Sequence, residues 1–194
     1  MIGMPVPSVL LHTRVRDETI EPNPFRWAPI RADKLMGLGR VAVFVFPAAF
    51  SPTCSDSHLP GVEELHDRLM DAGCTAVFGV AVNDAFTMHR WGVQLGIKKV
   101  RLVPDGNGDL ARRLGILVSR RHLGYGFRAW RSAFITDGGE IVAWFSEPRI
   151  EDDGGTDEDP YDETKPERVL EWCETHPVGD ADRRDEDRQK GAAA

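Results

Sequence analysis

The sequence is short of several features that define whole classes of protein. Its 194 residues contain only three cysteines, an odd number with no C-x-x-C spacing, which argues against a disulfide framework and against a zinc site. No apolar run approaches the roughly 20 residues that a membrane span needs. The net charge of −7 disfavours nucleic acid or an anionic membrane surface as a partner. We therefore expect a soluble domain that works in a reducing compartment.

The ends of the chain differ in composition from its middle. Residues 1–13 lack the charged start, long apolar stretch and small-residue cleavage site of a secretory signal, so we predict a cytoplasmic location. The last 45 residues are crowded with Asp and Glu, whereas 41% of the whole chain is hydrophobic, enough for one core. The predicted division is a domain over 4–148, an acidic linker over 149–165, a short docking helix over 166–176 and a disordered tail over 177–194.

Apolar periodicity predicts an α/β fold. Strands and helices alternate in short order through the middle of the chain, which implies parallel strands joined by right-handed crossovers. Two further strands are separated by Asp137-Gly138-Gly139 and form a predicted hairpin. A central mixed sheet flanked by helices is the expected result. The predicted strands are 41–46, 75–82, 100–103, 132–136 and 140–145, with a first short strand in 8–15; the predicted helices are 32–38, 54–70, 85–95, 109–114 and 166–175. We expect 17–30 to be an extended connection and 115–127 an irregular basic loop.

Cys54 occupies a special place in this pattern. The buried strand over 41–46 is closed by Pro47, and a short loop then delivers the cysteine to the first turn of a helix. The unpaired N–H groups and the partial positive charge of a helix start favour a thiolate, which is the reactive form of cysteine. The alternative is a small buried hydrophobic residue, as most free cysteines are.

The string PAAFSPTCSDSHLPG at 47–61 resembles the active-site segment of the peroxiredoxins, P-x-x-x-[TS]-x-x-C, and in particular the type-5 subgroup with its HLPG continuation. Pro47, Ser51 and Cys54 fall on the three motif positions. AVNDAF at 81–86 and RAWRSAFITDGG at 128–139 agree with the same family. The resemblance covers roughly 4–146.

This resemblance implies a thioredoxin-like fold and a thiol-dependent peroxidase. Cys54 would attack a hydroperoxide and become a sulfenic acid. Arg131, the arginine that the family register selects, would favour the thiolate and stabilise charge on the breaking O–O bond. Ser51 would donate a hydrogen bond to the peroxide or thiolate, backbone N–H groups of Thr53 and Cys54 would complete the cradle, and Pro47 would pack over the thiol.

Neighbouring residues leave alternatives open. Arg128 lies three positions before Arg131 and could be confused with it. His58 follows Cys54 by four residues and so shares its helix face, which permits a Cys–His pair of the thiol-protease kind, although single histidines of this sort are more often structural. Asp84 suits a helix cap better than an acid. No metal or cofactor is expected, because the cysteines and histidines have no ligand spacing.

The sulfenic acid has to be recycled. Cys74 follows the helix that Cys54 begins and is expected in the core, whereas Cys173 is the candidate for a resolving cysteine, weighed against a buried residue beside Trp172. Our first choice is a one-cysteine cycle reduced by glutathione, glutaredoxin or a thioredoxin. The family resemblance also implies a homodimer. The rival hypothesis is a redox-sensing or holdase module that uses Cys54 oxidation as a switch without significant turnover.

Overall fold

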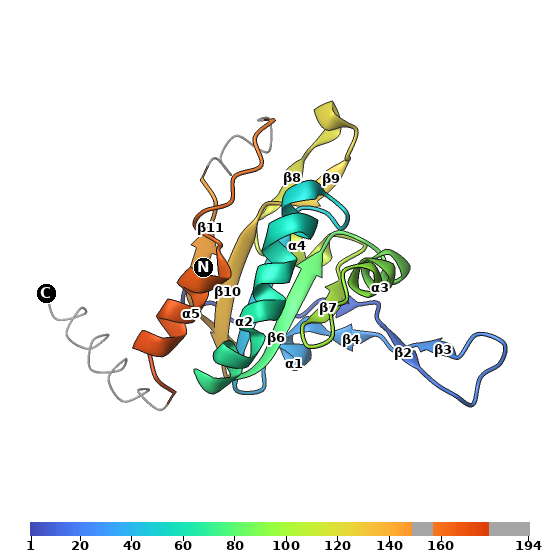
Figure 1. Ribbon diagram of the computed structural model, residues 1–194, viewed down its shortest axis with the longest axis horizontal. Helices are drawn as coiled ribbons and strands as arrows, with labels where there is room; N and C mark the ends of the chain where they lie inside the picture. Colours follow the sequence, from blue (N-terminus) through green and yellow to red (C-terminus); the bar gives the residue numbers. More distant parts are fainter. Residues whose placement is uncertain (149–156, 179–194) are drawn as a thin grey trace, which may run out of the picture.

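The computed structural model describes residues 1–148 and 157–178, and its centre is a five-stranded mixed sheet with the order β11-β10-β5-β6-β7 (Figure 1). Strands β5, β6 and β7 are parallel, and β10 and β11 form an antiparallel hairpin on the far side of β5. This is the predicted α/β arrangement. The strands are β5 (Arg40–Phe46), β6 (Cys74–Ala81), β7 (Arg101–Pro104), β10 (Ser132–Asp137) and β11 (Glu140–Ser146).

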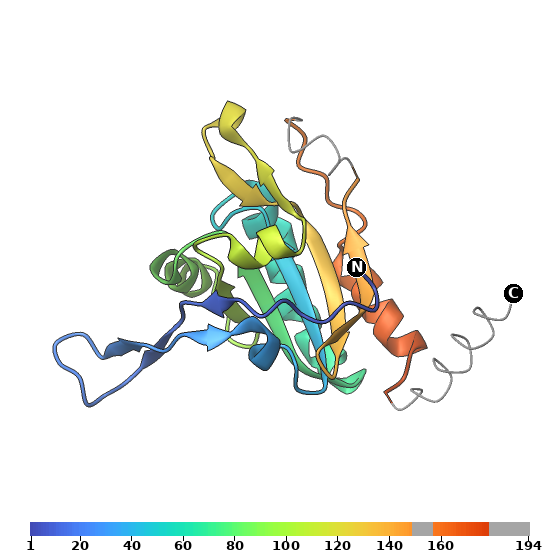
Figure 2. The ribbon, with the colours of Figure 1, turned by 180° about the vertical axis from the view of Figure 1, so that it is seen from behind.

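Strand β5 is buried along its whole length and divides the core in two. Because side chains alternate across a strand, Phe44 and Phe46 face one core and Val43 and Val45 face the other. Helices α2, α3 and α5 cover the first face, and α1, α4 and the N-terminal segment cover the second (Figures 1 and 2). The helices are α1 (Ala32–Leu35), α2 (Leu59–Asp71), α3 (Ala85–Gln94), α4 (Asp109–Arg113) and α5 (Pro166–Thr175).

The register of β5 separates two ends of the sheet. At the amino end, Arg40 lies opposite Cys74 of β6, and at the carboxyl end Phe46 lies opposite Ala81. Six residue steps of about 3.3 Å put these ends roughly 20 Å apart. Chemistry at the carboxyl end, where the loop from Pro47 begins, is therefore physically separate from chemistry at the amino end.

Two segments are more regular than predicted. The first runs from the expected strand in 8–15 through the expected extended connection over 17–30, and it forms two short antiparallel pairs of strands. In one pair the Arg14 guanidinium carbon lies 4.9 Å from the Phe25 ring centroid and 4.3 Å from the ring centroid of Phe86 in α3. The pairs are β1 (Leu10–Leu11) with β4 (Ile30–Arg31), and β2 (Arg14–Arg16) with β3 (Phe25–Trp27). Strands of two or three residues carry too little periodicity to be predicted.

The second segment is the basic stretch over 115–127, which was predicted to be irregular. It contains β8 (Leu117–Ser119) and a 3₁₀ turn, Arg121–Leu123, and leads into β9 (Phe127–Ala129), which pairs antiparallel with β8. The prediction of an irregular loop is wrong because left-handed Gly124 and Gly126, read as punctuation, allow the chain to reverse between the two strands.

The C-terminal segment does not behave as a free linker where the structure describes it. Helix α5 forms over Pro166–Thr175, as predicted, and the stretch over 157–165, here called the strap, runs back along the sheet before it (Figure 1). The remaining parts of the predicted linker and tail, 149–156 and 179–194, lie outside the described residues. Within the described part of the chain, no helix combines the length and the apolar character needed to cross a membrane.

Candidate active site

Cys54 lies where the chain leaves the carboxyl end of β5, and the helix that carries it is distorted at that point. Helical backbone begins at Pro52, two residues before the predicted start, and Cys54–His58 forms a π-helical turn in which the N–H of Leu59 bonds the carbonyl of Cys54. Pro60 explains the distortion, because it has no N–H and its ring crowds the preceding turn. The HLPG sequence therefore widens the helix next to the thiol.

The loop before Cys54 is held by its own polar groups. The amide oxygen of Asn83 accepts the N–H of Ala49 at 3.0 Å, and the hydroxyl of Ser51 donates to the carbonyl of Ala48 at 2.9 Å. Phe50 has a left-handed φ of 66°, which is rare and strained for a bulky residue. Ser51 thus stabilises the loop here, and its predicted bond to a peroxide or thiolate stays a prediction.

Arg131, the residue before β10, is the cation at the thiol. Its Nη1 donates to Cys54 Sγ at 3.3 Å, and both side chains are buried. The register explains this contact, because Ser132 lies opposite Val45, next to the end of β5 from which the Cys54 loop departs. Arg128 instead donates to the carbonyl of Phe127 at 2.8 Å. The structure therefore brings Arg131, and not Arg128, to the sulfur.

His58 supports the arginine. Its Nδ1 accepts from Arg131 Nη1 at 3.1 Å, which places the ring proton on Nε2. Burial, and then the positive charge of Arg131, lower the pKa of His58 well below its ordinary value, so the ring is neutral at pH 7. A neutral acceptor can orient the guanidinium without competing for its charge. Both members of the Cys–His pair that the sequence permits therefore contact the same nitrogen, Arg131 Nη1.

The strap supplies the rest of the arginine's environment. Arg131 Nε donates to the carbonyl of Pro160 at 2.9 Å, and its Nη2 forms a short ion pair with Asp159. The Tyr161 ring lies 5.5 Å from the Arg131 guanidinium carbon and 4.8 Å from the His58 ring. Four of the five guanidinium N–H groups therefore have partners among the described residues, which fixes the plane of the side chain.

Charge and burial set the ionisation of this cluster. Burial lowers the pKa of Arg131, but the charges of Cys54 and Asp159 outweigh it and the pKa is raised above its ordinary value. Burial, followed by the negative charge of Glu167, raises the pKa of Tyr161 to about 12. The site thus presents a permanent cation beneath a neutral, protonated phenol.

A buried glutamate anchors the strap. Glu147 Oε1 accepts the N–H groups of Asp162 and Thr164 at 2.9 Å each, and the Thr164 hydroxyl at 2.8 Å. Tyr161 of the strap packs on the active-site helix: its ring centroid lies 4.8 Å from that of His58, and a Cβ added at Gly61 would be 3.9 Å from the Tyr161 hydroxyl oxygen. The strap is therefore seated on the HLPG segment of the active-site helix.

The strap residues Asp159 and Tyr161 and their anchor Glu147 are not predicted from the sequence. Their acidic surroundings have the composition of a solvated linker, which hides them. One signal was available: the acidic end of the chain and the basic stretch before Arg131 are complementary. The structure brings these two segments into contact. The Asp157 carboxylate lies 3.2 Å from His122 Nε2, and Arg120 donates to the carbonyl of Glu158 at 3.2 Å.

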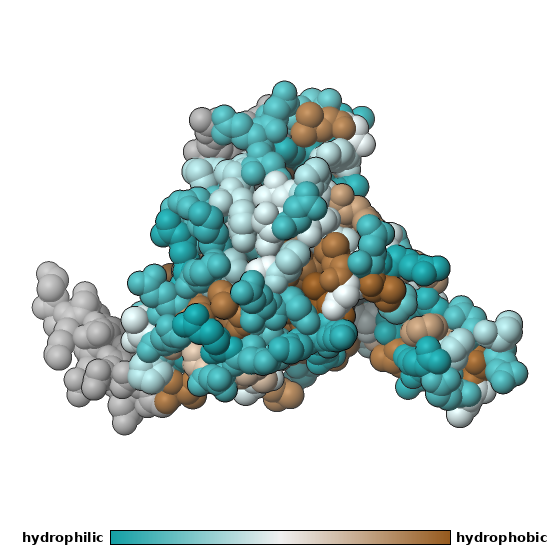
Figure 3. All heavy atoms as spheres, in the orientation of Figure 1, coloured by the Kyte–Doolittle hydropathy of each residue, from teal (hydrophilic) through white to brown (hydrophobic). Residues whose placement is uncertain are grey.

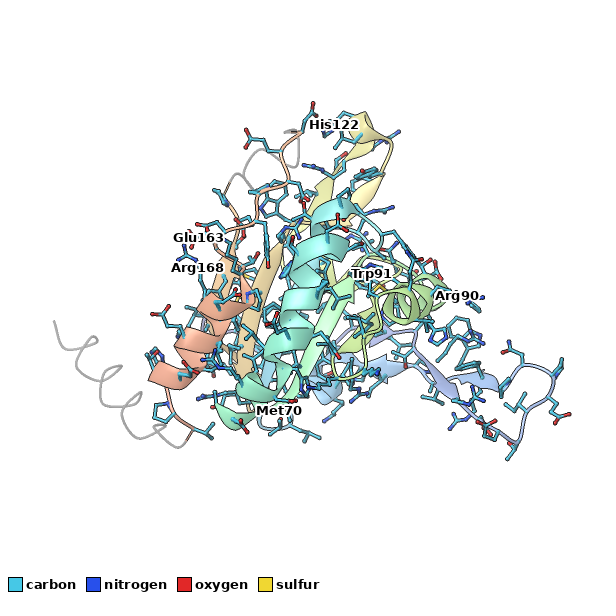
Figure 4. All side chains as sticks on the ribbon, in the orientation of Figure 1. Met70, Arg90, Trp91, His122, Glu163 and Arg168 are labelled. Atoms are coloured by element: carbon cyan, nitrogen blue, oxygen red, sulfur yellow. The ribbon has the colours of Figure 1, made fainter. Side chains whose placement is uncertain are left out.

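A narrow cavity lies against Arg131. It has a volume of about 10 Å³, room for about one water-sized molecule. Pro47 lines it together with Trp130, Arg131, Asp159 and Pro160. Cys54 is not among the residues that line this cavity, so the packing of Pro47 over the thiol stays a prediction. The π-helical turn over Cys54–His58 is also in contact with α3. The Trp91 indole of α3 points toward this turn and donates to Ser55 Oγ at 3.0 Å (Figure 4).

The structure brings some of the predicted site residues together and keeps others apart. Cys54 and Arg131 are in contact, and Pro47 borders the cavity beside the arginine. Thr53 has helical backbone angles, and the predicted role of its N–H stays a prediction. Cys173 contacts Cys74 and lies at the other end of the sheet. Among 1–148 and 157–178, no three His, Cys, Asp or Glu side chains gather as a metal-binding group.

Comparisons with known proteins agree with this geometry. A family model described as Redoxin matches residues 31–164. The chain is 43% identical over 171 residues to a peroxiredoxin of Sinorhizobium fredii, covering 88% of this chain and 90% of that one. It is 44% identical over 148 residues to a peroxiredoxin of Synechocystis, covering 76% and 78%. The crystal structure of reduced Prx3 of Vibrio vulnificus in complex with H₂O₂ superposes with a TM-score of 0.75 at 27% identity, covering 91% of this chain and 97% of that one.

Proposed function

The chain belongs to the redoxin family as a peroxiredoxin, a thiol peroxidase of thioredoxin-like fold, and from this premise we propose that Cys54 reduces hydroperoxides in a one-cysteine cycle. The observation that carries the proposal is the 3.3 Å contact between Arg131 Nη1 and Cys54 Sγ inside a buried site. A guanidinium at this distance favours the charged sulfur over the neutral thiol. The proposed nucleophile, Cys54, and the cation that stabilises its charged form, Arg131, are thus in direct contact.

In the proposed reaction the Cys54 thiolate attacks one peroxide oxygen. The S–O bond forms as the O–O bond breaks, the sulfur is oxidised to a sulfenic acid, and the other oxygen leaves as water or an alcohol after taking a proton. Arg131 stabilises the negative charge that passes from sulfur to the leaving oxygen. Since four of its N–H groups are already held, the remaining Nη2–H is the donor available to the substrate.

We propose hydrogen peroxide and small alkyl hydroperoxides as the substrates. The strap covers Arg131 and occupies its Nε–H and one Nη2–H, which favours a small molecule at the donor that is left. The H₂O₂ complex of the Vibrio vulnificus relative supports the same substrate class. Ser51 and the backbone of Thr53 and Cys54 would orient the bound peroxide, with Pro47 at the wall.

The proposed reductant is an external thiol: glutathione, glutaredoxin or a thioredoxin. Cys74 and Cys173 are both near the amino end of the sheet, roughly 20 Å along β5 from the end that holds Cys54. For Cys173 to act as a resolving cysteine, α5 would have to leave β6. All three cysteines are free thiols, which fits a reducing compartment and supports the cytoplasm as the location.

We also propose a homodimer. Apolar side chains are exposed around α3 and the nearby N-terminal hairpin, and the space-filling view shows apolar surface over α3 (Figure 3). Phe50 in the active-site loop is 46% exposed, Phe86 at the start of α3 is 52% exposed and Trp27 is 55% exposed. An interface here would cover these residues next to the loop that carries the thiol.

Peroxide consumption with a supplied reductant tests the proposal against the redox-sensor alternative. We expect repeated turnover of hydrogen peroxide with glutathione and glutaredoxin or with thioredoxin and its reductase. When the reductant is left out, intact-mass measurement should show one added oxygen on the chain, and mass analysis after digestion should place it on the Cys54 peptide. Oxidation of Cys54 without turnover by any of these thiols would overturn the enzymatic proposal in favour of a switch.

A further inference from the structure

A second pair of reactive groups lies at the amino end of the sheet. The sulfurs of Cys74 and Cys173 are 3.9 Å apart, although 99 residues separate them in the sequence. Cys74 begins β6 and is 4% exposed, and Cys173 lies in the last turns of α5 and is 1% exposed. A disulfide bond is about 2 Å long, so the sulfurs need to approach by roughly 2 Å, within reach of side-chain rotation and a small movement of α5.

A buried arginine faces this pair. Arg40 is 1% exposed and lies opposite Cys74 in the β5–β6 register. Its Nη1 donates to the carbonyl of His176, which follows α5, and its guanidinium lies 5.5 Å from the Trp172 ring. Its Nε and Nη2 have no hydrogen-bond partner among the described residues, and the Asp137 carboxylate is 3.9 Å from Nη2. A cation with unfilled donors is thus held beside two thiols.

The two sulfurs are not equivalent. The hydrogen-bonding contact between the two thiols lowers the pKa of Cys173 and raises that of Cys74. Burial raises the pKa of both thiols, and the positive charge of Arg40 lowers the pKa of both. Cys173 is therefore the nucleophile of the pair, and Cys74 is the proton donor.

We propose that Cys74 and Cys173 are a second redox site, a buried dithiol that a hydroperoxide oxidises to an intramolecular disulfide and that a reducing thiol reopens. The Cys173 thiolate takes one peroxide oxygen and becomes a sulfenic acid while the other oxygen leaves as water or an alcohol. The Cys74 sulfur then forms the S–S bond and expels water, so the two thiols together lose two electrons.

The disulfide would join α5 to β6. Helix α5 is preceded directly by the strap, whose residues Asp159 and Pro160 hold Arg131. Oxidation at the amino end would thus secure the cover of the thiol at the carboxyl end. Figure 4 shows Met70, four residues before Cys74, at the opposite end of the molecule from His122, which pairs with the strap. The two redox sites are therefore distinct but linked through one segment.

The test uses the full chain with Cys54→Ser, so that chemistry at Cys54 cannot contribute. The folded variant is treated with hydrogen peroxide, quenched with acid, alkylated and digested with trypsin. The three cysteines fall in three different tryptic peptides, 41–68, 69–90 and 169–183. We expect a mass loss of about 2 Da and a link between the second and third peptides, forming at least about tenfold more slowly than oxidation of Cys54 in the unsubstituted chain, because the pair is buried.

Matched variants identify the site. Adding Cys74→Ser to the Cys54→Ser chain should prevent the link and leave a sulfenic acid on Cys173. Oxidation of the Cys54→Ser chain should raise its Tm by roughly 5–15 °C, because the bond closes a long loop, and a reducing thiol should reverse the shift.

Three results would overturn the proposal. The first is a Cys54→Ser chain that keeps native circular dichroism but gains no link. The second is a Tm that does not rise on linkage. The third is an unsubstituted chain in which Cys173 joins Cys54, since Cys173 would then resolve the peroxidatic cysteine.

Discussion

The two ends of the central sheet carry the same pair of groups, a buried cysteine and a buried arginine, in different surroundings. At the carboxyl end the guanidinium of Arg131 is held on several sides and touches a single sulfur. At the amino end Arg40 has unfilled donors and lies beside two sulfurs that touch each other. The residue types are the same at both ends, so we expect the chemistry of each end to follow from how firmly the cation is held and from what lies next to the sulfur.

The largest expected effect comes from removing the sulfur at each end. Cys54→Ser should reduce hydroperoxide removal by at least about 10³-fold, because no other thiol lies beside Arg131 among the described residues. Cys173→Ser should change it by less than about twofold when an external thiol is supplied. Stopped-flow peroxide consumption measures both. Equal losses of hydroperoxide removal in the two variants would mean that Cys54 and Cys173 contribute equally to peroxidase activity.

The arginines provide the second comparison. Arg131→Met should lower kcat/KM for hydrogen peroxide by about 10²–10³-fold, as loss of one preorganised donor does in other enzymes. Arg40→Met removes a buried cation far from the substrate and should leave kcat/KM nearly unchanged in the folded fraction. Steady-state kinetics and a check of the folded fraction by circular dichroism measure these effects. An Arg40→Met chain as inactive as Arg131→Met would show that the ends are functionally coupled.

The strap gives a smaller effect at the carboxyl end. Asp159→Asn keeps the shape of the side chain but removes the charge paired with Arg131, and we expect kcat/KM to fall about tenfold, as for other groups that orient a catalytic residue. The substitution Glu163→Gln in the same strap is the control and should change kcat/KM by less than about twofold, since the Glu163 carboxylate lies 3.6 Å from Arg168 and not beside Arg131. Unchanged kinetics in Asp159→Asn would mean that Pro160 and His58 alone position Arg131.

The smallest expected effect is on stability and depends on pH. The pKa of His58 is lowered in the folded state, so the unfolded state binds more protons below an unperturbed pKa of about 6.5. The contribution of His58 to the free energy of unfolding is thus complete above that pH and is lost as pH falls below it. Each unit by which the pKa of His58 in the folded state lies below that in the unfolded state contributes about 1.4 kcal/mol to the free energy of unfolding at neutral pH.

His58→Asn tests this sign, since an amide oxygen can replace Nδ1 as an acceptor but does not titrate. Urea unfolding at pH 7.5 and 5.5 should show a smaller loss of stability on acidification in the variant than in the parent chain. Peroxidase activity at pH 7.5 should be largely kept. An equal pH dependence in both chains would exclude His58 as the source.

The sequence predicted the parts of this molecule that depend on long patterns. The five strands of the central sheet and the helices between them have clear periodicity. The family resemblance selected Arg131 as the partner of Cys54, and the structure finds the two in contact. The turn at Cys54 was less predictable, because the π-helical widening depends on how Pro60 meets the preceding carbonyls. The short pairs β2–β3 and β8–β9 have too few residues for a period to be visible.

The remainder of the site depends on contacts between distant segments. Asp159 and Tyr161 are in a run of acidic residues whose composition is that of a linker, and nothing local indicates that Glu147 captures this run. The closeness of Cys74 and Cys173 is of the same kind. Cys74 was expected in the core and is buried there, but its partner depends on where α5 docks, which no local pattern determines.

The anchoring of the strap by Glu147 also bears on where the functional unit ends. A chain shortened after residue 148 would retain every strand of the central sheet and the whole peroxiredoxin motif. It would nevertheless lose the carboxylate, the carbonyl and the aromatic ring that surround the Arg131 guanidinium. Shortening would also remove α5, whose Val169 and Leu170 are buried in the core, so a piece that holds every strand and the whole motif need not be a piece that works.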